Sequence, residues 1–145
     1  MIWRIPPTLE ALNSMSTNTL VGHLDIKFSE IGDDYLCATM PVDARTVQPF
    51  RLLHGGASVA LAETIGSVAS TLMIELQTQM AVGLEINANH LKSTSEGDIV
   101  TGKVSPVRIG RTIHVWNIEI TNSAGQLVCV SRITMAVIDL SLIHI

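Results

Sequence analysis

The stretch "QPFRLLHGGASVALAETIGSVAS", residues 48–70, predicts one long helix that organises the rest of the fold. The helix is expected from about Gly55 to Glu75. Bulky apolar residues recur at spacings of four, three and four, the period of one helix face: Leu61, Ile65, Val68 and Leu72. The opposite face is small, with a single large polar member: Gly56, Ala60, Glu63, Ser67 and Ser70. A helix this apolar on all sides is expected to be buried.

Strand patterns surround this helix. Alternating or β-branched segments predict strands at 21–28, 34–42, 80–92, 98–107, 112–122 and 126–139. A short helix is expected at 8–15, with Thr8 as its N-cap. In the segment 80–92, a period of two places Met80, Val82, Leu84, Ile86 and Ala88 on one face, and the strand at 98–107 is expected to stop near Pro106. The order predicts an α+β fold in which a curved antiparallel sheet wraps one central helix.

Size and composition limit the classes of protein and partner to be considered. The 145 residues predict one domain, 1–145, with the tail from about Ser141 left uninterpreted. Hydrophobic residues make up 47% and charged residues only 15%, which favours a homo-oligomer. A net charge of −4 disfavours nucleic acid and membrane surfaces as partners. Two cysteines without CxxC spacing disfavour a metal site, and a start without a signal-peptide core favours the cytoplasm.

Glu63 is the first candidate for chemistry. It is the only Asp, Glu, Lys or Arg between Arg51 and Glu75. A buried, unpaired carboxylate costs several kcal/mol or takes up a proton, so a chain keeps one most readily where it is used. The alternative is a surface glutamate that reaches solvent. Ser67, one turn further on, could bind the carboxylate or a water, or could simply be small enough for close packing.

His54, Gly55 and Gly56 precede the predicted helix. Backbone amides at a helix N-terminus have no partner within the helix and lie at the positive end of its dipole, so they can hold an oxyanion or polarise a carbonyl. The alternative is a turn that needs glycine for its backbone. His54 could cap the helix or act as a general acid. Gln48 is a neutral donor on the same loop and indicates nothing alone.

Basic residues gather late in the chain. Four of nine lie between positions 92 and 111: Lys92, Lys103, Arg108 and Arg111. Only Glu96 and Asp98 oppose them, and His90 and His114 flank them. The cluster could hold a phosphorylated ligand, or it could be an ordinary solvated hairpin. Walker, GxGxxG, GxSxG and HExxH motifs are absent from the sequence.

The segments "QPFRLLHGGASVALAETIGSVA", "VGLEINANHLKS" and "IGRTIHVW" resemble hotdog-fold acyl-CoA thioesterases. More narrowly, they resemble the bacterial 1,4-dihydroxy-2-naphthoyl-CoA hydrolases of menaquinone synthesis, to which the enterobactin-pathway proofreading thioesterases are related. The resemblance covers nearly the whole chain. It implies hydrolysis of aromatic CoA thioesters without metal or redox cofactor.

The resemblance also implies roles for the candidate residues. Glu63 would act as nucleophile on the thioester or as base on water, and Ser67 would position either group. The Gly55 amide would polarise the thioester carbonyl, which Gln48 and His54 would orient. Each site would lie at a dimer interface, with Glu63 and Ser67 facing the other three residues of a partner chain. Two dimers would pair as a tetramer.

The CoA nucleotide would lie near the surface, against residues from three segments: Gly83; His90, Leu91, Lys92 and Ser93; Arg108, Gly110 and Arg111. Its phosphates would contact Lys92 or Arg111. One departure concerns Arg51, since close relatives tend to have glycine there. We expect its side chain to make the acyl pocket narrower or to add a positive charge to it.

Three other activities stay open at this point. The chain could be a proofreading thioesterase that acts on aryl carrier proteins. It could be a hotdog dehydratase or hydratase, which would leave the thioester intact. It could also be a non-catalytic sensor of CoA esters or a docking module for a carrier protein, which would bind CoA without turnover. Release of a thiol separates the hydrolases from the rest.

Overall fold

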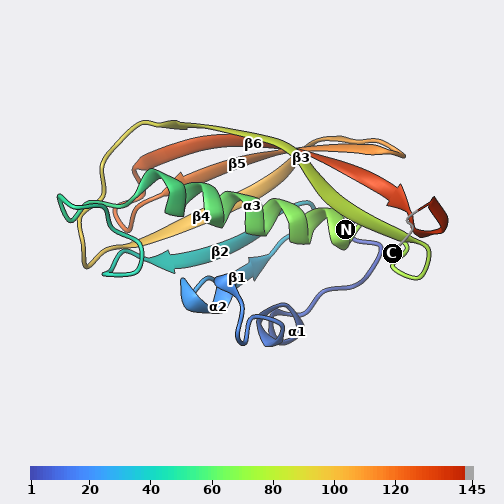
Figure 1. Ribbon diagram of the computed structural model, residues 1–145, viewed down its shortest axis with the longest axis horizontal. Coiled ribbons are helices and arrows are strands. Elements are labelled where there is room, and N and C mark those ends of the chain that lie inside the picture. The colour runs from blue at the N-terminus through green and yellow to red at the C-terminus, as the bar shows by residue number, and fades with distance from the viewer. Residues whose placement is uncertain (143–145) are drawn as a thin grey trace.

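The computed structural model describes residues 1–142. Its helices and strands follow in the order α1 (Leu9–Ser14), α2 (Leu20–His23), β1 (Lys27–Ile31), β2 (Leu36–Pro41), α3 (Gly55–Thr71), β3 (Gln79–His90), β4 (Ile99–Ile109), β5 (Ile113–Thr121), β6 (Leu127–Asp139) and the 3-10 turn η1 (Leu140–Leu142). Figure 1 shows α3 lying along the sheet, with α1 and α2 beside β1. None of the helices within residues 1–142 is long and apolar enough to cross a bilayer.

The sheet has six strands in the order β1-β2-β4-β5-β6-β3, and all neighbouring strands are antiparallel. It curves around α3, so the predicted α+β hotdog architecture is confirmed (Figure 1). Because β1 and β3 are the two ends of this order, each leaves one edge unpaired among the strands of residues 1–142. An unpaired edge offers a row of backbone donors and acceptors to another chain.

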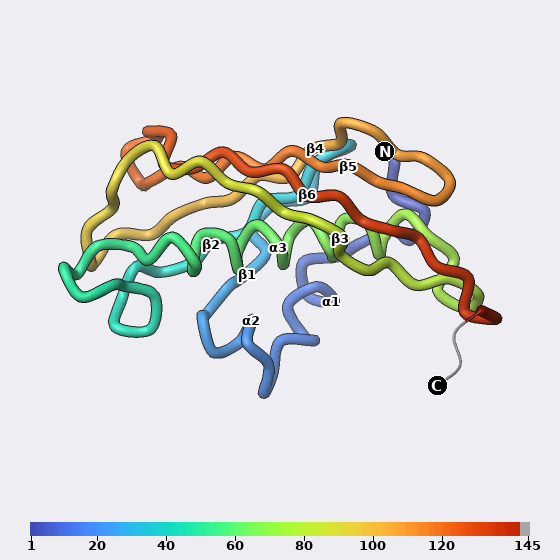
Figure 2. Tube along the Cα trace, turned by 45° about the horizontal axis from the view of Figure 1, so that its top comes forward, coloured from blue at the N-terminus to red at the C-terminus, as the bar shows by residue number. Residues whose placement is uncertain are grey.

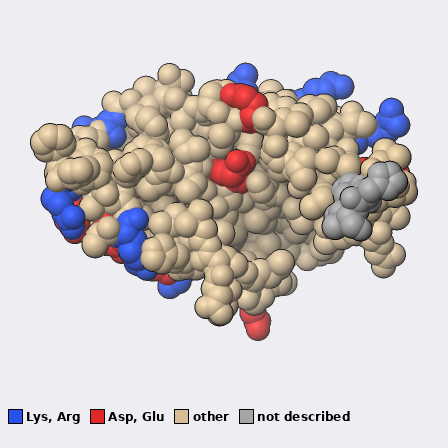
Figure 3. Space-filling model, in the orientation of Figure 1, with Lys and Arg blue, Asp and Glu red and all other residues tan. Residues whose placement is uncertain are grey.

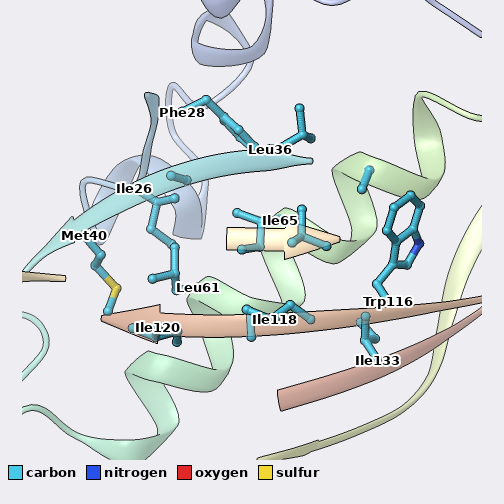
Figure 4. Packing of buried hydrophobic residues seen from close by; sticks show 14 of the residues in the cluster. Ile26, Phe28, Leu36, Met40, Leu61, Ile65, Trp116, Ile118, Ile120 and Ile133 are labelled. Carbon is cyan, nitrogen blue, oxygen red and sulfur yellow. The ribbon is translucent and has the colours of Figure 1, made fainter. Parts of the chain in front are cut away.

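The core lies between α3 and the concave face of the sheet. Figure 4 shows Leu61 and Ile65 of α3 directed at side chains of β2 and β5. Trp116, Ile118 and Ile120 of β5 are all fully buried, as their predicted alternation requires. The helix approaches β6 closely, since a Cβ at Gly66 would stand 2.6 Å from a methyl carbon of Ile133. Glycine at position 66 therefore allows the helix and sheet to pack at this distance.

The ends of α3 are set by its neighbours. His54 caps the start, with its side chain accepting the Gly56 N–H. The helix stops at Thr71, earlier than the predicted Glu75, and Leu72 is its C-cap. The Leu72 carbonyl accepts hydrogen bonds from the N–H groups of Arg4 and Ile5, at 2.9 and 3.2 Å. The N-terminal segment thus satisfies a carbonyl that a helix end leaves without an intrahelical partner.

Strand β3 differs from its predicted pattern. A bulge between Gly83 and Glu85 shifts the register against β6. A bulge inserts one extra residue, so side chains before and after it change faces. Ala81 packs against the core on one side of the bulge and Ile86 on the other, while Leu84 is 59% exposed. The prediction of a single face from Met80 to Ala88 is therefore wrong.

Two other predictions need correction. Residues 21–28 are not one strand, because Thr19 caps the short helix α2 and the strand begins only at Lys27. Strand β4 does not stop near Pro106 but continues to Ile109 through a bulge between Pro106 and Arg108. A bulge tolerates proline because it interrupts the ladder of hydrogen bonds there. The predicted N-cap at Thr8 is confirmed, with its Oγ1 accepting the Ala11 N–H.

Candidate active site

The loop before α3 and the end of β3 enclose one groove of about 380 Å³. Six of the predicted site residues line it: Gln48, Gly55, His90, Leu91, Lys92 and Ser93. The contact between the two walls is close, since a Cβ at Gly55 would stand 2.9 Å from Nε2 of His90. Glycine at position 55 therefore makes room for the imidazole of His90 at the N-terminus of the helix.

The N-terminus of α3 presents a free donor. His54 Nδ1 accepts the Gly56 N–H at 2.7 Å, and the N–H groups of Ala57 and Ser58 bond to the His54 carbonyl. Within residues 1–142 the Gly55 N–H has no hydrogen-bond acceptor. It lies at the positive end of a 17-residue helix. An amide so placed can stabilise negative charge that develops on an oxygen.

Gln48 is held in a tight turn at the edge of the groove. Its backbone N–H donates to the Leu52 carbonyl and its carbonyl accepts the Arg51 N–H, both at 2.8 Å. Its side-chain Oε1 accepts the Phe50 N–H. The two N–H bonds of the Gln48 side-chain amide are therefore available to a ligand.

His54 lies apart from the groove that contains Gln48 and Gly55. It lines a separate hollow together with Gly56 and residues of α2 and the loop after β2. Because Nδ1 accepts the Gly56 N–H, a neutral His54 ring carries its proton on Nε2, and the residue is exposed. His54 can thus donate a hydrogen bond, but on a different side of the loop.

Glu63 is exposed in the single protomer, contrary to the prediction that α3 buries it. Its neighbours on the helix, Ala60, Thr64 and Ser67, are half-buried. Its Oε2 atom lies 3.3 Å from the position that a Cβ would take at Gly83. Ser67 does not bond to Glu63; its Oγ contacts Sδ of Met135 at 3.9 Å. Figure 3 shows isolated acidic side chains near the centre of one face of the molecule, with basic side chains toward its periphery.

Glu63 and Gly55 of one chain cannot act on the same carbonyl. They are eight residues apart on one helix, which is about 12 Å at 1.5 Å per residue. The residues predicted to bind CoA are also divided. His90 pairs with Cys129 at one end of β6, whereas Gly83 pairs with Met135 toward the other end, where the β4–β5 hairpin lies. Within a protomer, Gly83 therefore lies apart from residues 90–93.

The predicted basic site at Arg108, Gly110 and Arg111 forms the β4–β5 hairpin. The Gly110 N–H bonds to the Ile113 carbonyl at 2.8 Å, which closes the turn. Both arginines are exposed there. The hairpin therefore offers exposed cations at the sheet end opposite to Lys92.

Arg51 is not among the residues that line the groove. Its guanidinium donates to both carboxylate oxygens of Glu96, with Nε 2.7 Å from Oε2. Its φ of 62° lies in the left-handed region, which glycine adopts at little cost. Glycine would adopt this backbone conformation at lower cost than arginine does.

Two features were missed by the sequence reasoning. The first is an apolar cavity of about 440 Å³ between α1 and α3, whose lining includes Leu12, Phe28, Thr64 and Val68. Figure 2 shows α1 and α2 on the side of α3 away from β3, and residues of both short helices line the cavity. No local signal predicts it, because it depends on how the N-terminal segment packs.

The second is a buried polar network. Trp116 Nε1 donates to Ser70 Oγ at 2.6 Å, and Ser70 Oγ lies 2.9 Å from His114 Nδ1. Burial lowers the pKa of His114. The signal was present in the sequence, since His114 shares the alternation of Trp116 and Ile118. It is thus a core residue and does not belong to the basic cluster.

Comparisons with known proteins agree with this geometry. Residues 50–129 match the family model described as the thioesterase superfamily. The chain is 57% identical to the 1,4-dihydroxy-2-naphthoyl-CoA hydrolase of Escherichia coli, over 95% of this chain and 100% of that one. It is 51% identical to the proofreading thioesterase EntH of Cronobacter turicensis, over 94% and 98%. A mutant thioesterase from Pseudomonas aeruginosa superposes with a TM-score of 0.94 at 46% identity, covering 97% and 100%. The chain therefore belongs to the thioesterase superfamily and is a thioester hydrolase.

Proposed function

We propose that this protein hydrolyses aromatic acyl-CoA thioesters of the hydroxynaphthoyl or hydroxybenzoyl type to the free acid and CoA. The observation that carries the substrate class is the apolar cavity beside α3. Two of its lining residues, Thr64 and Val68, directly follow Glu63 and Ser67 on the helix. An aromatic ring in this cavity would lie against the same helix as the proposed catalytic carboxylate, about 100° around its axis from Glu63. The name of the Escherichia coli relative supports 1,4-dihydroxy-2-naphthoyl-CoA, an intermediate of menaquinone synthesis, as the substrate.

The proposed reaction adds water across the thioester and releases the acid and the CoA thiol. The Gly55 N–H would stabilise the negative charge that develops on the carbonyl oxygen. Gln48 would donate its side-chain N–H to the same oxygen. Glu63 would attack the carbonyl carbon, forming an anhydride that water then opens, or would remove a proton from the attacking water. Single-turnover hydrolysis in labelled water separates these routes, because only the anhydride route can place label in Glu63.

A two-fold dimer would unite the separated groups. Glu63 touches Gly83, and Gly55 touches His90, on the free-edge strand β3. If two β3 edges pair antiparallel with Gly83 opposite the partner subunit's His90, then Glu63 meets the partner subunit's Gly55. Antiparallel partners that face each other point to the same side of a sheet, and both contacts are on the side of α3. We propose this pairing as the dimer interface.

The same pairing would bring together the residues proposed for CoA. The groove residues His90, Leu91, Lys92 and Ser93 of one subunit would lie near Gly83 of the other. Arg108, Gly110 and Arg111 lie at the same end of the sheet as Gly83 in their own subunit. Lys92 of one subunit or Arg111 of the other could therefore donate charge-assisted hydrogen bonds to the CoA phosphates. His54 would donate from its Nε2, and Ser67 would position water beside Glu63. The reaction as proposed needs no metal or redox cofactor.

The role of Glu63 is tested by Glu63→Gln, which removes the charge and keeps the shape. We expect kcat to fall by at least about a hundredfold, as for loss of a general base or nucleophile. Glu85→Gln is the matched control, because Glu85 is an exposed carboxylate on β3 two residues from Gly83. Wild-type turnover by folded Glu63→Gln with naphthoyl-CoA or benzoyl-CoA would refute the assignment.

The shared site is tested by complementation between subunits. Glu63→Gln and Gln48→Ala are each expected to be inactive, yet a mixed dimer keeps one intact site. Co-refolding equal amounts should restore about one quarter of the wild-type activity, since half of the dimers are mixed and each has one good site of two. No recovery in verified mixed dimers would show that each site lies within one chain.

A thioesterase panel tests the substrate. We expect the highest kcat/KM for dihydroxynaphthoyl-CoA, a lower value for benzoyl-CoA and the lowest for aliphatic CoA esters. Similarity to EntH makes aryl carrier-protein thioesters the informative comparison. A higher kcat/KM for these than for any CoA ester would replace the proposed substrate. An intact thioester after product formation would indicate a dehydratase or hydratase.

We also propose that two dimers pair as a tetramer and that the enzyme works in the cytoplasm, where the CoA thioesters would be available. The low content of charged residues, 15% of the chain, supports an extensive contact between subunits. Light scattering after size exclusion should give about four times the protomer mass of 15.6 kDa. A mass of two protomers would agree with the proposed active dimer and would refute the tetramer.

A further inference from the structure

Arg51 has a backbone conformation that arginine rarely adopts. Its φ is 62°, in the left-handed region, where a side chain with a Cβ costs about 1–2 kcal/mol. Such a residue persists only when its surroundings hold it in place. The contacts that hold Arg51 are therefore informative.

Glu96 holds Arg51 at three points. The guanidinium donates two hydrogen bonds to the carboxylate, Nε to Oε2 at 2.7 Å and Nη2 to Oε1 at 2.5 Å. The Glu96 N–H also donates to the Arg51 carbonyl at 3.1 Å. A β-bridge between Leu52 and Ser95 continues the contact. The turn at 48–52 is thus clamped to the loop that joins β3 to β4, and both lie at one end of the molecule (Figure 1).

The clamped turn contains Gln48, and the clamping loop begins at the opposite wall of the groove. The Arg51 N–H donates to the Gln48 carbonyl, so a change at Arg51 acts directly on Gln48. Leu91, Lys92 and Ser93 of the other loop line the same groove as Gln48. The distance across the groove is therefore coupled to the contact between Arg51 and Glu96.

We propose that the Arg51–Glu96 ion pair is a positioning device that fixes Gln48 against the active-site groove. The inference rests on the proposed function, in which the Gln48 side chain donates to the thioester carbonyl. The pair is more than a third exposed on both sides, at 55% and 38%. An exposed pair contributes little to global stability, so it acts on the conformation of the turn and not on folding.

The test compares Arg51→Ala, Arg51→Gly and Glu96→Gln. Arg51→Ala loses the clamp and keeps the unfavourable φ, so kcat should fall about two- to fivefold, the effect of an exposed ion pair. Glu96→Gln should lose a similar factor. Arg51→Gly also loses the clamp but adopts this φ freely, so its kcat should lie between those of Arg51→Ala and the wild type. The double variant Arg51→Ala/Glu96→Gln should lose no more than either single variant.

Two further measurements distinguish positioning of Gln48 from a contribution to the stability of the whole fold. Thermal midpoints of Arg51→Ala, Glu96→Gln and the double variant should stay within about 2 °C of the wild type, since little unfolding free energy is lost. Amide hydrogen exchange in residues 48–53 should accelerate in Arg51→Ala and Glu96→Gln, while exchange in α3 stays unchanged. The exchange readout does not depend on activity, so it reports on the clamp even if the proposed substrate is wrong.

Asp25 and Lys27 supply the matched control. Asp25 also has a positive φ, 56°, and pairs with Lys27 at 3.3 Å, but at the start of β1 and outside the groove. Lys27→Gln should leave kcat and the exchange of residues 48–53 unchanged. Wild-type kcat and wild-type exchange in both Arg51→Ala and Glu96→Gln would overturn the proposal. A loss of kcat that matches an equal loss of stability would also overturn it.

Discussion

The carboxylate of Glu63 on α3 lies against the backbone of Gly83 on the free edge of β3, with its Oε2 atom 3.3 Å from where a Cβ would stand. This contact links the helix to the edge strand at the face that the protomer leaves open. It fixes one side of the Glu63 side chain and leaves the other side for a substrate. Residue 83 is therefore sensitive to the addition of a single methyl group.

Gly83→Ala should lower kcat about tenfold, because the added methyl displaces the Glu63 carboxylate by a few tenths of an ångström or more. The backbone at Gly83 does not have a positive φ, so alanine fits the strand without strain. Steady-state kinetics with an aromatic CoA ester measure the effect. Asn87→Ala, on the outer face of the same strand, should keep wild-type kcat. Equal kcat for Gly83→Ala and the wild type would show that the contact does not position Glu63.

Ala11→Phe should raise KM for naphthoyl-CoA about tenfold and leave KM for acetyl-CoA nearly unchanged. Ala11 lines the apolar cavity from α1, so a phenyl ring there would occupy the space proposed for the acyl group. Ala11→Ser is the control, since it adds little volume at the same position. If Ala11→Phe altered KM for both esters to the same degree, the acyl group would not lie in this cavity.

The unfolding free energy should decrease as the pH falls from 7.5 to 5.5. Burial lowers the pKa of His114 below its ordinary value of 6.5, so below that pH the unfolded chain takes up a proton that the folded chain does not. The stability from this group is thus complete above pH 6.5 and is lost as the pH falls through the depressed pKa. Urea titrations should show the unfolding free energy fall over this range.

His114→Asn controls for other titrating groups. The difference in unfolding free energy between wild type and variant should shrink as the pH falls over the same range. Trp116 Nε1 donates to Ser70 Oγ, which also lies 2.9 Å from His114 Nδ1, so the substitution alters one member of a buried hydrogen-bonded network. A pH-independent difference would place the titration elsewhere.

The protein's thiols should not react with a thiol reagent at pH 8 in the native state. Burial, followed by the nearby Glu30 carboxylate, raises the pKa of the Cys37 thiol to about 11. Burial also raises the pKa of Cys129. At pH 8 only about a thousandth of Cys37 would be thiolate, the reactive form. Two thiols per chain should appear only after unfolding in guanidinium, and rapid reaction of the folded protein would contradict the burial.

The pattern of the sequence was sufficient for the architecture. The stripe of Leu61 and Ile65 and the alternation of Trp116, Ile118 and Ile120 reflect burial on one face, so periodicity alone predicts the helix and the strands that pack on it. The bulges at Gly83 and Pro106 were not predictable, because each depends on the hydrogen bonding of a neighbouring strand distant in the sequence. The end of α3 at Thr71 likewise depends on the N-terminal segment that binds the Leu72 carbonyl.

The sequence by itself determined which groups are chemically available: a lone carboxylate at Glu63, a glycine amide at the start of a helix, and a neutral donor at Gln48. Only the tertiary structure decided where they lie. It joins Gln48, Gly55 and His90 in one groove and places Glu63 about 12 Å along the helix, on an exposed face beside a free strand edge. The reason is that residue types are local, whereas distances and burial depend on how the segments of the chain pack together in the fold.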